Sequence, residues 1–541
     1  MRARYRIVRW LNSLSDDGTV TVSASTATIR PNVLFITLDQ FRADTLGCAG
    51  HPLVKTPNLD ALAAGGVRFA RHYSQAAPCG PGRAALYTGT YQMNNRVVAN
   101  GTPLNARFDN VALVATRAGY RPTLFGYTDQ SVDPRVVADR SDPRLSTYEG
   151  VLPGFEEGLL LVENQDPWLD WLRGLGYSID NAVQAWLSEG DRPAEHSTTT
   201  FLTNHVEAWI RARCAAQVSG DKGPWFAHAS YLRPHPPYRA AGHYATMYNP
   251  ADCPLPQPIP TNQHPVFAGL LGNRSYAASA RKTSIAQNRA QYYGMVTEVD
   301  DQLGRLWATL QELGAWDNTL IVVTADHGEQ LGDQGLLGKA GFYESSYNVL
   351  SLIRDPGLPD GHGRVVNAFT ENVDILPTVC ERIDVPTPMQ CDGVSLGAFL
   401  IGLTPPIWRE AATYEWDWRE DTLIAQASSE TTGSANLERT QSTQEAGASG
   451  VSGASPTGEL NTEAPLEQQH LCVRRNNKHA YVQFGDGTWR CFNLALDPTW
   501  QTEETDPLVI LAQAQAMLVW RSTHTDRTLT STLLRKSAIG L

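Results

Sequence analysis

The 541-residue sequence has no Cys-x-x-Cys pair, no basic stripe and no apolar run long enough to cross a bilayer. Its eight cysteines are scattered along the chain, which disfavours a zinc knuckle and a disulfide scaffold. A formal net charge of −12 argues against a nucleic-acid partner, because binding a polyphosphate needs concentrated Lys and Arg. An anionic ligand would have to be attracted by a local positive site.

The amino-terminal segment also lacks the features of a secretory signal. Residues 1–10 are basic, but the polar residues 12–17 follow directly, without an intervening apolar segment. We therefore expect no membrane association and a cytoplasmic location. The length and the 42% hydrophobic content are typical of a globular protein with one large domain and a smaller appendage.

Strand-like apolar runs alternate with helical patterns between about residues 32 and 400, which predicts an α/β fold with helices on both faces of a sheet. Residues 32–38 and 319–324 are two such runs. Between them, apolar side chains recur at helical spacing over residues 292–310, and Gly314 ends this pattern. We predict a helix there that leads directly into the second strand.

The last third of the chain has a different composition. Residues 425–469 are rich in Ser, Thr, Gly, Ala and Glu and have no aromatic residue, which predicts a flexible insertion. Alternating and aromatic residues at 414–418 and 471–492 predict a small antiparallel sheet around it. Residues 508–520 form a helical pattern that precedes a polar tail, and residues 1–30 are predicted to be a loosely attached extension.

Three strand-like runs end in polar residues that can bind a ligand. In open α/β sheets, ligand sites lie beyond the carboxyl ends of the strands. Two carboxylates, an amide oxygen and an imidazole at one edge predict a site for one divalent cation, Mn²⁺ or Ca²⁺. Any such Asp alone is more often a helix cap, and a lone His is often only hydrogen-bonded, but the joint pattern favours a metal site. The residues are Asp39 and Gln40, Asp326 and His327, and Arg233 and His235.

The segment from Pro78 to Arg83 gives the sharpest signal, because Pro81 suits the first turn of a helix that residues 84–88 continue. Cys79 is then expected at the positive end of the helix dipole, with Arg83 one turn further on. One interpretation is a buried thiol beside a turn. Another is a thiolate nucleophile, as in a phosphatase, with its pKa lowered by the dipole and the arginine.

A third interpretation comes from a family resemblance. Cys79, Pro81 and Arg83, followed by Thr88 and Gly89, resemble the site at which sulfatases convert a cysteine to formylglycine. The resemblance to the sulfatase and alkaline phosphatase superfamily implies an alkaline-phosphatase-like core, with a mixed, mostly parallel sheet between helices. It implies a catalytic domain at residues 31–410 and a carboxy-terminal subdomain at residues 411–541. Further matching segments are residues 39–40, 56–69, 325–333 and 373–378.

Within the superfamily the sequence is most similar to phosphonate monoester hydrolases, which also cleave phosphodiesters and some aryl sulfates. Tyr127 and Asp129 stand where sulfatases usually have Lys and His, and Gln40 and His327 replace an Asp and an Asn. With fewer negative ligands, the cation offers more positive charge to an anionic substrate. The segments that support this branch are residues 93–96, 126–128, 233–237, 336–339, 414–417 and 520–530.

The resemblance implies a role for each matching residue. The implied metal ligands are Asp39, Gln40, Cys79, Asp326 and His327. The implied catalytic residues are Cys79, Arg83, His235 and Lys339, and the implied substrate contacts are Asn100, Tyr127 and Asp129. Taken singly, Lys339 can equally be a surface lysine, Tyr127 a half-buried aromatic and Asn100 a turn former. Asp129 departs from the Thr usual in related hydrolases and would repel an anion unless a cation or Arg neutralises it.

By resemblance, hydrated formylglycine at position 79 attacks phosphorus, and His235 protonates the leaving alkoxide. The cation, Arg83 and Lys339 hold the non-bridging oxygens. The expected reaction is hydrolysis of phosphonate monoesters and phosphodiesters, with a secondary arylsulfatase activity. Maturation then requires a formylglycine-generating enzyme, and the carboxy-terminal tail resembles segments that form homo-oligomers, here a tetramer.

Other functions remain open on the sequence. A true arylsulfatase would share the fold and the nucleophile. A phosphotransferase or mutase of the same superfold would usually have Ser or Thr as nucleophile and a second metal set. An inactive homologue used as a binding module would not need the intact motifs. The insertion at residues 425–469 is also open to interpretation as a partner-recruiting segment.

Overall fold

The computed structural model describes residues 30–220, 223–273, 275–419 and 465–525. Its strands are β1 (Asn32–Leu38), β2 (Val67–Tyr73), β3 (Ala76–Ala77), β4 (Pro122–Gly126), β5 (Glu156–Leu160), β6 (Phe226–Tyr231), β7 (Thr319–Thr324), β8 (Ser351–Arg354), β9 (Arg364–Glu371), β10 (Ala411–Asp417), β11 (His470–Asn476), β12 (His479–Phe484) and β13 (Trp489–Asn493). Its helices are α1 (Pro57–Ala64), α2 (Cys79–Thr88), α3 (Gln92–Asn95), α4 (Val111–Arg117), α5 (Asp166–Gly174), α6 (Ala182–Leu187), α7 (Thr198–Val218), α8 (Pro265–Gly272), α9 (Lys282–Glu312), α10 (Ile375–Arg382), α11 (Gly397–Leu400) and α14 (Pro507–His524).

The predicted α/β fold is confirmed. In the described part of the chain, a central sheet has eight strands in the order β5-β4-β6-β1-β7-β8-β2-β9, and only β8 runs antiparallel to its neighbours. Strand β1 lies between β6 and β7, with Thr37 opposite both Ser230 and Thr324. Because the three strands are parallel, the residues that follow them meet at one edge of the sheet.

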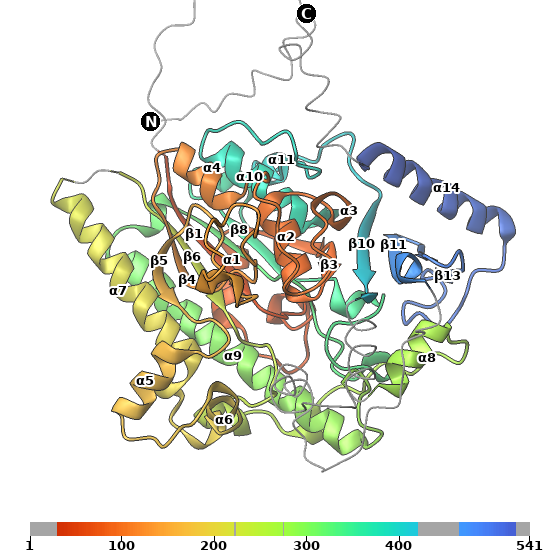
Figure 1. Cartoon of the computed structure of the whole chain (residues 1–541), viewed down its shortest axis with the longest axis horizontal. Helices are drawn as coiled ribbons and strands as arrows, with labels where there is room; N and C mark the ends of the chain where they lie inside the picture. Colours follow the sequence, from red (N-terminus) through yellow and green to blue (C-terminus); the bar gives the residue numbers. More distant parts are fainter. Residues whose placement is uncertain (1–29, 221–222, 274, 420–464, 526–541) are drawn as a thin grey trace, which may run out of the picture. The chain divides into compact units, whose positions relative to one another are not determined.

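Side-chain alternation along β1 divides the core between the two faces of the sheet. Leu34 and Ile36 pack in one buried cluster with residues of α7 and α9, whereas Val33 and Phe35 pack in another with residues of α2, α4 and α10. Figure 1 shows these two sets of helices beside the sheet. Each such fully buried side chain contributes about 1.5–3 kcal/mol relative to an exposed one, so both helix layers are held firmly.

Helix α9 confirms the long helix predicted before the second strand. Residues 292–310 form its central part, and the backbone beyond Glu312 turns at Gly314, where φ is +66°. This left-handed conformation is one that glycine adopts without steric cost. A short 3-10 turn, Trp316–Asn318, then leads into β7.

Helix α2 begins at Cys79, as the Pro81 signal indicates, and all of its residues are buried. Its packing depends on Gly82. A Cβ atom at this position would lie 2.6 Å from the carbonyl oxygen of Asp326 and 3.0 Å from that of Ala76. The absence of a side chain therefore lets the first turn of α2 approach the segment that follows β7.

The predicted carboxy-terminal sheet is also present. Within the described residues it has the order β13-β12-β11-β10-β3, antiparallel except between β10 and β3. Strand β3 immediately precedes Pro78 and Cys79, and it pairs through Ala77 with Trp416. The carboxy-terminal sheet thus holds the backbone that leads into the start of α2. Residues 508–520, predicted to be helical, lie in α14.

Several expectations fall outside what the structure describes. The extension at residues 1–30, apart from Arg30, and residues 425–464 of the predicted insertion lie outside the described residues. The last residues of that insertion are described: Leu466–Gln468 form a 3-10 turn and Gln469 is buried. The boundary at residue 410 remains a prediction. No helix among the described residues combines the length and the apolar character needed to span a bilayer.

Candidate metal centre and active site

Four potential ligands meet at the carboxyl edge of the central sheet. One ligand atom each from Asp39, Cys79, Asp326 and His327 lies within 4.8 Å of the others, and all four side chains are buried. They come from the segment after β1, the start of α2 and the segment after β7. The sequence prediction that these residues lie together agrees with this geometry.

His327 presents an unprotonated nitrogen to this cluster. Its Nδ1 lies 2.9 Å from the carbonyl oxygen of Gly328 and must donate, because a carbonyl only accepts. Its Nε2 lies 3.2 Å from Cys79 Sγ and 3.9 Å from Asp39 Oδ1. Burial lowers the pKa of His327 to about 4, so the ring is neutral at pH 7. A neutral imidazole is the form that binds a metal ion.

The two carboxylates each keep one oxygen near the cluster. Asp39 Oδ2 accepts from the Tyr127 hydroxyl at 2.6 Å and from Arg83 Nη2 at 3.1 Å, which leaves Oδ1 beside Cys79. Asp326 Oδ2 accepts from Arg83 Nε at 2.9 Å. Burial and the charge of Asp326 raise the pKa of Asp39. A divalent cation would relieve this repulsion, so the donor set fits such an ion.

Gln40 is oriented by a carboxylate that the sequence reasoning missed. Its backbone is left-handed, with φ at +66°, and its Nε2 donates to Glu329. The Glu329 carboxylate also accepts from the backbone N–H groups of Leu331 at 2.8 Å and Gly338 at 2.7 Å. Since Nε2 is fixed on this side, Gln40 Oε1 points the other way, 3.1 Å from Lys339 Nζ. The only sequence signal was a glutamate within the segment 325–333.

Lys339 supplies the local positive charge that an anionic ligand needs. Its Nζ donates to Cys79 Sγ at 2.9 Å and lies 3.3 Å from His235 Nε2. Burial disfavours the ammonium, but the negative charge of neighbouring groups, the Asp39 and Asp326 carboxylates among them, outweighs it and raises the pKa of Lys339. Lys339 is therefore a charged, half-buried residue of this site and not a surface lysine.

Arg83 lies behind the carboxylates instead of over Cys79. The side chain is fully buried, and Nη1 donates to the Tyr127 carbonyl at 3.2 Å and to Ser230 Oγ at 2.7 Å. Its other nitrogens bind Asp39 and Asp326, and the guanidinium stacks 4.3 Å from the centre of the Tyr127 ring. This geometry differs from the expected contact with substrate oxygens. Arg83 instead fixes the two carboxylate ligands.

The three expected substrate contacts surround this arginine and the start of α2. Asp129 Oδ2 lies 3.4 Å from Arg83 Nε, and burial raises the pKa of Asp129 to about 7. The neutralising Arg required by the sequence reasoning is therefore present. Tyr127 is buried with its hydroxyl on Asp39. Asn100 Oδ1 accepts from the Gly80 N–H at 2.8 Å, which positions the first turn of α2.

The surroundings of the unmodified Cys79 side chain disfavour the thiolate interpretation. Burial and the neighbouring Asp39 carboxylate raise the pKa of the Cys79 thiol well above its ordinary value. The helix start and Lys339 do not outweigh these effects. Arg83, which was expected to lower this pKa, is engaged with the carboxylates. These contacts therefore favour the protonated thiol in the unmodified protein.

His235 reaches the site from the segment after β6. Its Nδ1 lies 2.7 Å from the carbonyl oxygen of Pro236 and therefore donates to it, so Nε2 faces Lys339 as an acceptor. Burial, followed by the charge of Lys339, lowers the pKa of His235 to about 3. The ring is thus neutral at pH 7, so it must gain a proton before it can act as a general acid.

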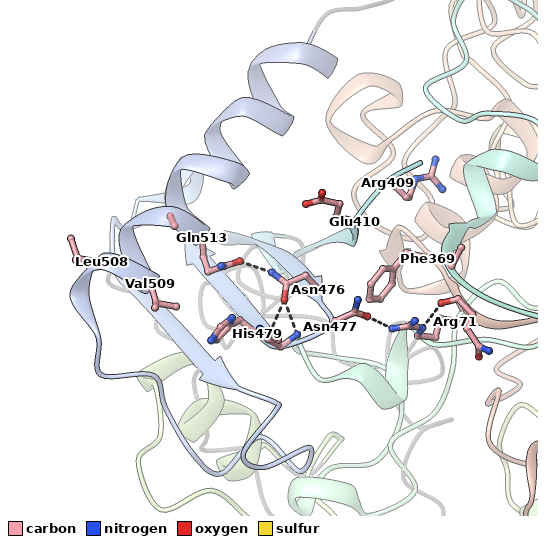
Figure 2. Close-up of a pocket in the computed structure, with 14 residues that line it drawn as sticks. Arg71, Phe369, Arg409, Glu410, Asn476, Asn477, His479, Leu508, Val509 and Gln513 are labelled. Carbon is pink, nitrogen blue, oxygen red and sulfur yellow. Dashed lines mark hydrogen bonds between the residues drawn. The ribbon is translucent and has the colours of Figure 1, made fainter. Parts of the chain in front are cut away.

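A separate groove lies away from these residues. Its volume is about 780 Å³, and it lies between β9, the turn between β11 and β12, and α14. Figure 2 shows Arg71, Phe369, Asn477 and Gln513 around it. No predicted site residue lines this groove, so the chemistry belongs to the buried cluster and not to this surface feature.

Comparison with known proteins agrees with this site. The sequence profile of the sulfatase family matches residues 31–385. The chain is 34% identical over 549 residues to the multifunctional alkaline phosphatase superfamily protein PehA of Trinickia caryophylli, covering 95% of this chain and 99% of that protein.

Two solved structures are similar over nearly the whole chain. The phosphonate monoester hydrolase of Agrobacterium radiobacter has a TM-score of 0.76 and 38% identity, covering 93% of this chain and 97% of the other. The enzyme of the same name from Silicibacter pomeroyi has a TM-score of 0.77 and 36% identity, covering 92% and 97%. The chain belongs to the sulfatase family of hydrolases, and its fold is that of the phosphonate monoester hydrolases.

Proposed function

We propose that this protein hydrolyses phosphonate monoesters and phosphodiesters, with a secondary arylsulfatase activity, after Cys79 is converted to formylglycine. The observation that carries the proposal is the position of Cys79 at the start of α2, with its sulfur in the cluster of Asp39, Asp326 and His327 atoms that spans 4.8 Å. The similarity to PehA and to two phosphonate monoester hydrolases supports this choice of substrates. The alternative is an arylsulfatase.

The metal ion of the proposal is one divalent cation, Mn²⁺ or Ca²⁺, held by Asp39, Gln40, Asp326, His327 and the side chain of residue 79. Oxygen donors with one imidazole suit either ion. When bound, the cation supplies positive charge that stabilises the ester oxygens and lowers the pKa of a coordinated hydroxyl. Arg83 and Glu329 keep the ligand oxygens in place.

Formylglycine, once formed by a formylglycine-generating enzyme, supplies a hydrated aldehyde whose hydroxyl is the nucleophile. Lys339, whose Nζ lies 2.9 Å from the residue 79 side chain, holds the non-bridging oxygens of the substrate. His235 donates the proton to the leaving oxygen, and its Nε2 lies 3.3 Å from Lys339 Nζ, on the side of the residue 79 side chain. Proton donation of this kind contributes about 100- to 10,000-fold to the rate.

The substrate preference follows from the charges around the site. Lys339 provides the ammonium of the pocket, and Asp129 adds a carboxyl whose pKa of about 7 leaves it partly charged at neutral pH. A substrate with one negative charge is repelled less by Asp129 than one with two. This balance favours phosphodiesters and phosphonate monoesters, each of which carries a single negative charge on its phosphorus oxygens.

The test has two stages. Mass spectrometry of the tryptic peptide of residues 72–83, from protein isolated from its own host, is expected to show the thiol replaced by an aldehyde oxygen. The ratio kcat/KM is then measured for a 4-nitrophenyl phosphonate, bis(4-nitrophenyl) phosphate and 4-nitrophenyl sulfate. A preference for the sulfate supports the arylsulfatase, and an unmodified cysteine throughout overturns the mechanism.

A further inference from the structure

The segment that carries His235 is held by a fully buried arginine. Arg233 Nη1 donates to the carbonyl oxygen of His235 at 2.8 Å and to that of Pro237 at 3.2 Å. Its Nη2 forms an ion pair with Glu189. One guanidinium therefore holds the backbone on both sides of Pro236, next to the residue whose ring faces Lys339.

Glu189 anchors this contact to a rigid part of the fold. It begins a 3-10 turn, Glu189–Asp191, and its Oε1 accepts from the N–H of Thr198 at 2.9 Å. Thr198 is the first residue of α7, which packs against the central sheet. The side chains of Arg233 and Glu189 are 0% and 1% exposed, so solvent does not compete for their contacts.

Stability alone does not account for a buried ion pair here. Removing two charges from water costs about as much as their attraction returns, and a well-packed apolar pair of similar volume is often equally stable. What an apolar pair cannot do is donate two hydrogen bonds to carbonyl oxygens two residues apart. This capacity matters because the backbone that Arg233 holds carries His235, whose Nε2 lies 3.3 Å from Lys339 Nζ, which in turn contacts Cys79.

We propose that Arg233, held by Glu189, is a positioning residue that aims His235 at the leaving group. The inference rests on the proposed function, because it presupposes that His235 passes a proton to the leaving oxygen. Arg233 does not touch the reacting atoms. It acts through the backbone of residues 235–237, and a displacement of about 1 Å at a reacting group can cost about 100-fold in rate.

The test measures how the rate depends on the leaving group. Removal of a proton donor slows esters with poor leaving groups, whereas a good leaving group such as 4-nitrophenolate departs without help. The ratio kcat/KM is measured for phosphonate monoesters of 4-nitrophenol, phenol and an alkyl alcohol. His235→Ala sets the benchmark, with a loss of about 100-fold or more for the alkyl ester and a much smaller loss for the 4-nitrophenyl ester.

The double variant Arg233→Met/Glu189→Gln removes the clamp without leaving an unpaired buried charge. Its kcat/KM is expected to fall about 10- to 100-fold for the alkyl ester and much less for the 4-nitrophenyl ester, which is the pattern expected of His235→Ala. Arg233→Lys keeps a charge opposite Glu189 and is expected to restore part of the loss. If the double variant does not fold, Arg233→Lys alone must show a smaller loss in kcat/KM with the same dependence on the leaving group.

The double variant Arg382→Met/Asp355→Asn is a matched control, because it removes another buried ion pair, between the end of α10 and the residue that follows β8. It is expected to change all three rates equally. A uniform loss in the Arg233 variants, like that of the control, overturns the positioning role and leaves the proposed function standing. A formylglycine-containing wild-type protein that cleaves none of the esters overturns the proposed function, and the positioning role with it.

Discussion

At the scale of single residues, three of the candidate ligands, Asp39, Asp326 and Gln40, are each held by a second group that faces away from the cluster. Arg83 binds one oxygen of Asp39 and one of Asp326, and Glu329 binds the amide nitrogen of Gln40. Each contact leaves the remaining oxygen directed at the same small volume. The geometry of a metal ligand is therefore set as much by these partners as by the ligand itself.

The substitution Glu329→Gln tests this arrangement. The amide keeps one oxygen for the N–H groups of Leu331 and Gly338, but it replaces the carboxylate that accepts from Gln40 Nε2. Gln40 then loses its fixed orientation, and the affinity for Mn²⁺ is expected to fall about 10- to 100-fold. Competition with a chelator measures the dissociation constant. Glu157→Gln, at an exposed position, is the control, and an unchanged affinity in Glu329→Gln would contradict the argument.

Gly82→Ala tests the close approach of α2 to the segment after β7. The added methyl group would lie 2.6 Å from the Asp326 carbonyl oxygen, and backbone atoms cannot move aside cheaply. We expect a loss of about 1–3 kcal/mol in the free energy of unfolding, together with weaker metal binding. Denaturant unfolding of the variant and of the wild type measures the change in the free energy of unfolding. Gly174→Ala is the control, because nothing lies within 4 Å of its Cβ position, and it is expected to cost nothing.

The sequence was enough to identify the polar residues that follow the strands. It was not enough to predict the direction in which the side chains around them point. Asp39 and Asp326 follow apolar runs, and the parallel arrangement of those strands is enough to bring them together. Arg83 was placed one helical turn from Cys79, which is correct, but its side chain turns to the carboxylates. Such choices depend on contacts between distant segments, which no local pattern contains.

At the scale of secondary-structure elements, the long regular segments were the predictable ones. The bounds of β1 and β7 match the apolar runs, and α9 follows from its helical periodicity. Strand β3 could not be predicted, because two residues carry no periodic pattern. Yet β3 joins the carboxy-terminal sheet to the start of α2, so an element too short to recognise links the two sheets of the described structure.

Helix α14 offers a test of how the carboxy-terminal elements are held. Met517 is its buried residue, 3% exposed, and its sulfur lies 3.4 Å from Cys472 Sγ on β11. Met517→Ala is expected to cost about 2–5 kcal/mol locally and to raise amide hydrogen exchange in α14. Leu518→Ala is the matched neighbour, because Leu518 is 65% exposed and should change little. Equal exchange in the two variants would show that Met517 does not hold the helix.

At the scale of the whole molecule, the net charge of the chain is opposite in sign to the charge that Lys339 brings to the candidate site. A net charge of −12 would repel an anionic ester, but the half-buried Lys339 lies beside Cys79 with its ammonium maintained by neighbouring negative groups. A cation bound to Asp39 and Asp326 would add to this local attraction. The family and its mixed sheet were predictable from motifs, because those motifs stand at strand ends and helix starts.

Buried histidines set one limit of the pH range over which the fold is stable. Burial lowers the pKa of His72 to about 4, and its ring bonds with Thr370 and Asn372 at 2.9 and 3.0 Å. Its stabilising contribution is complete above the ordinary pKa of 6.5 and is lost as the pH falls from about 6.5 to 4. This loss amounts to about 3 kcal/mol at most. His72→Gln should remove that part of the acid sensitivity, as measured by urea unfolding at pH 4.5 and 7.

A buried carboxyl on α9 acts in the opposite direction. Burial, followed by repulsion from Glu189, raises the pKa of Glu298 to about 8, above its ordinary value of 4.5. The folded protein then holds a proton that the unfolded chain releases, so stability falls as the pH rises from 4.5 towards 8. Glu298→Gln keeps the shape of the protonated acid without a group that ionises. Its free energy of unfolding relative to wild type should therefore increase by about 2–4 kcal/mol between pH 5 and pH 8.

Urea unfolding of both proteins at the two pH values measures this difference. The control is Glu312→Gln, because Glu312 is exposed. A difference that stays constant with pH would mean that Glu298 is already ionised in the folded protein, and that Arg233 is shared between two carboxylates.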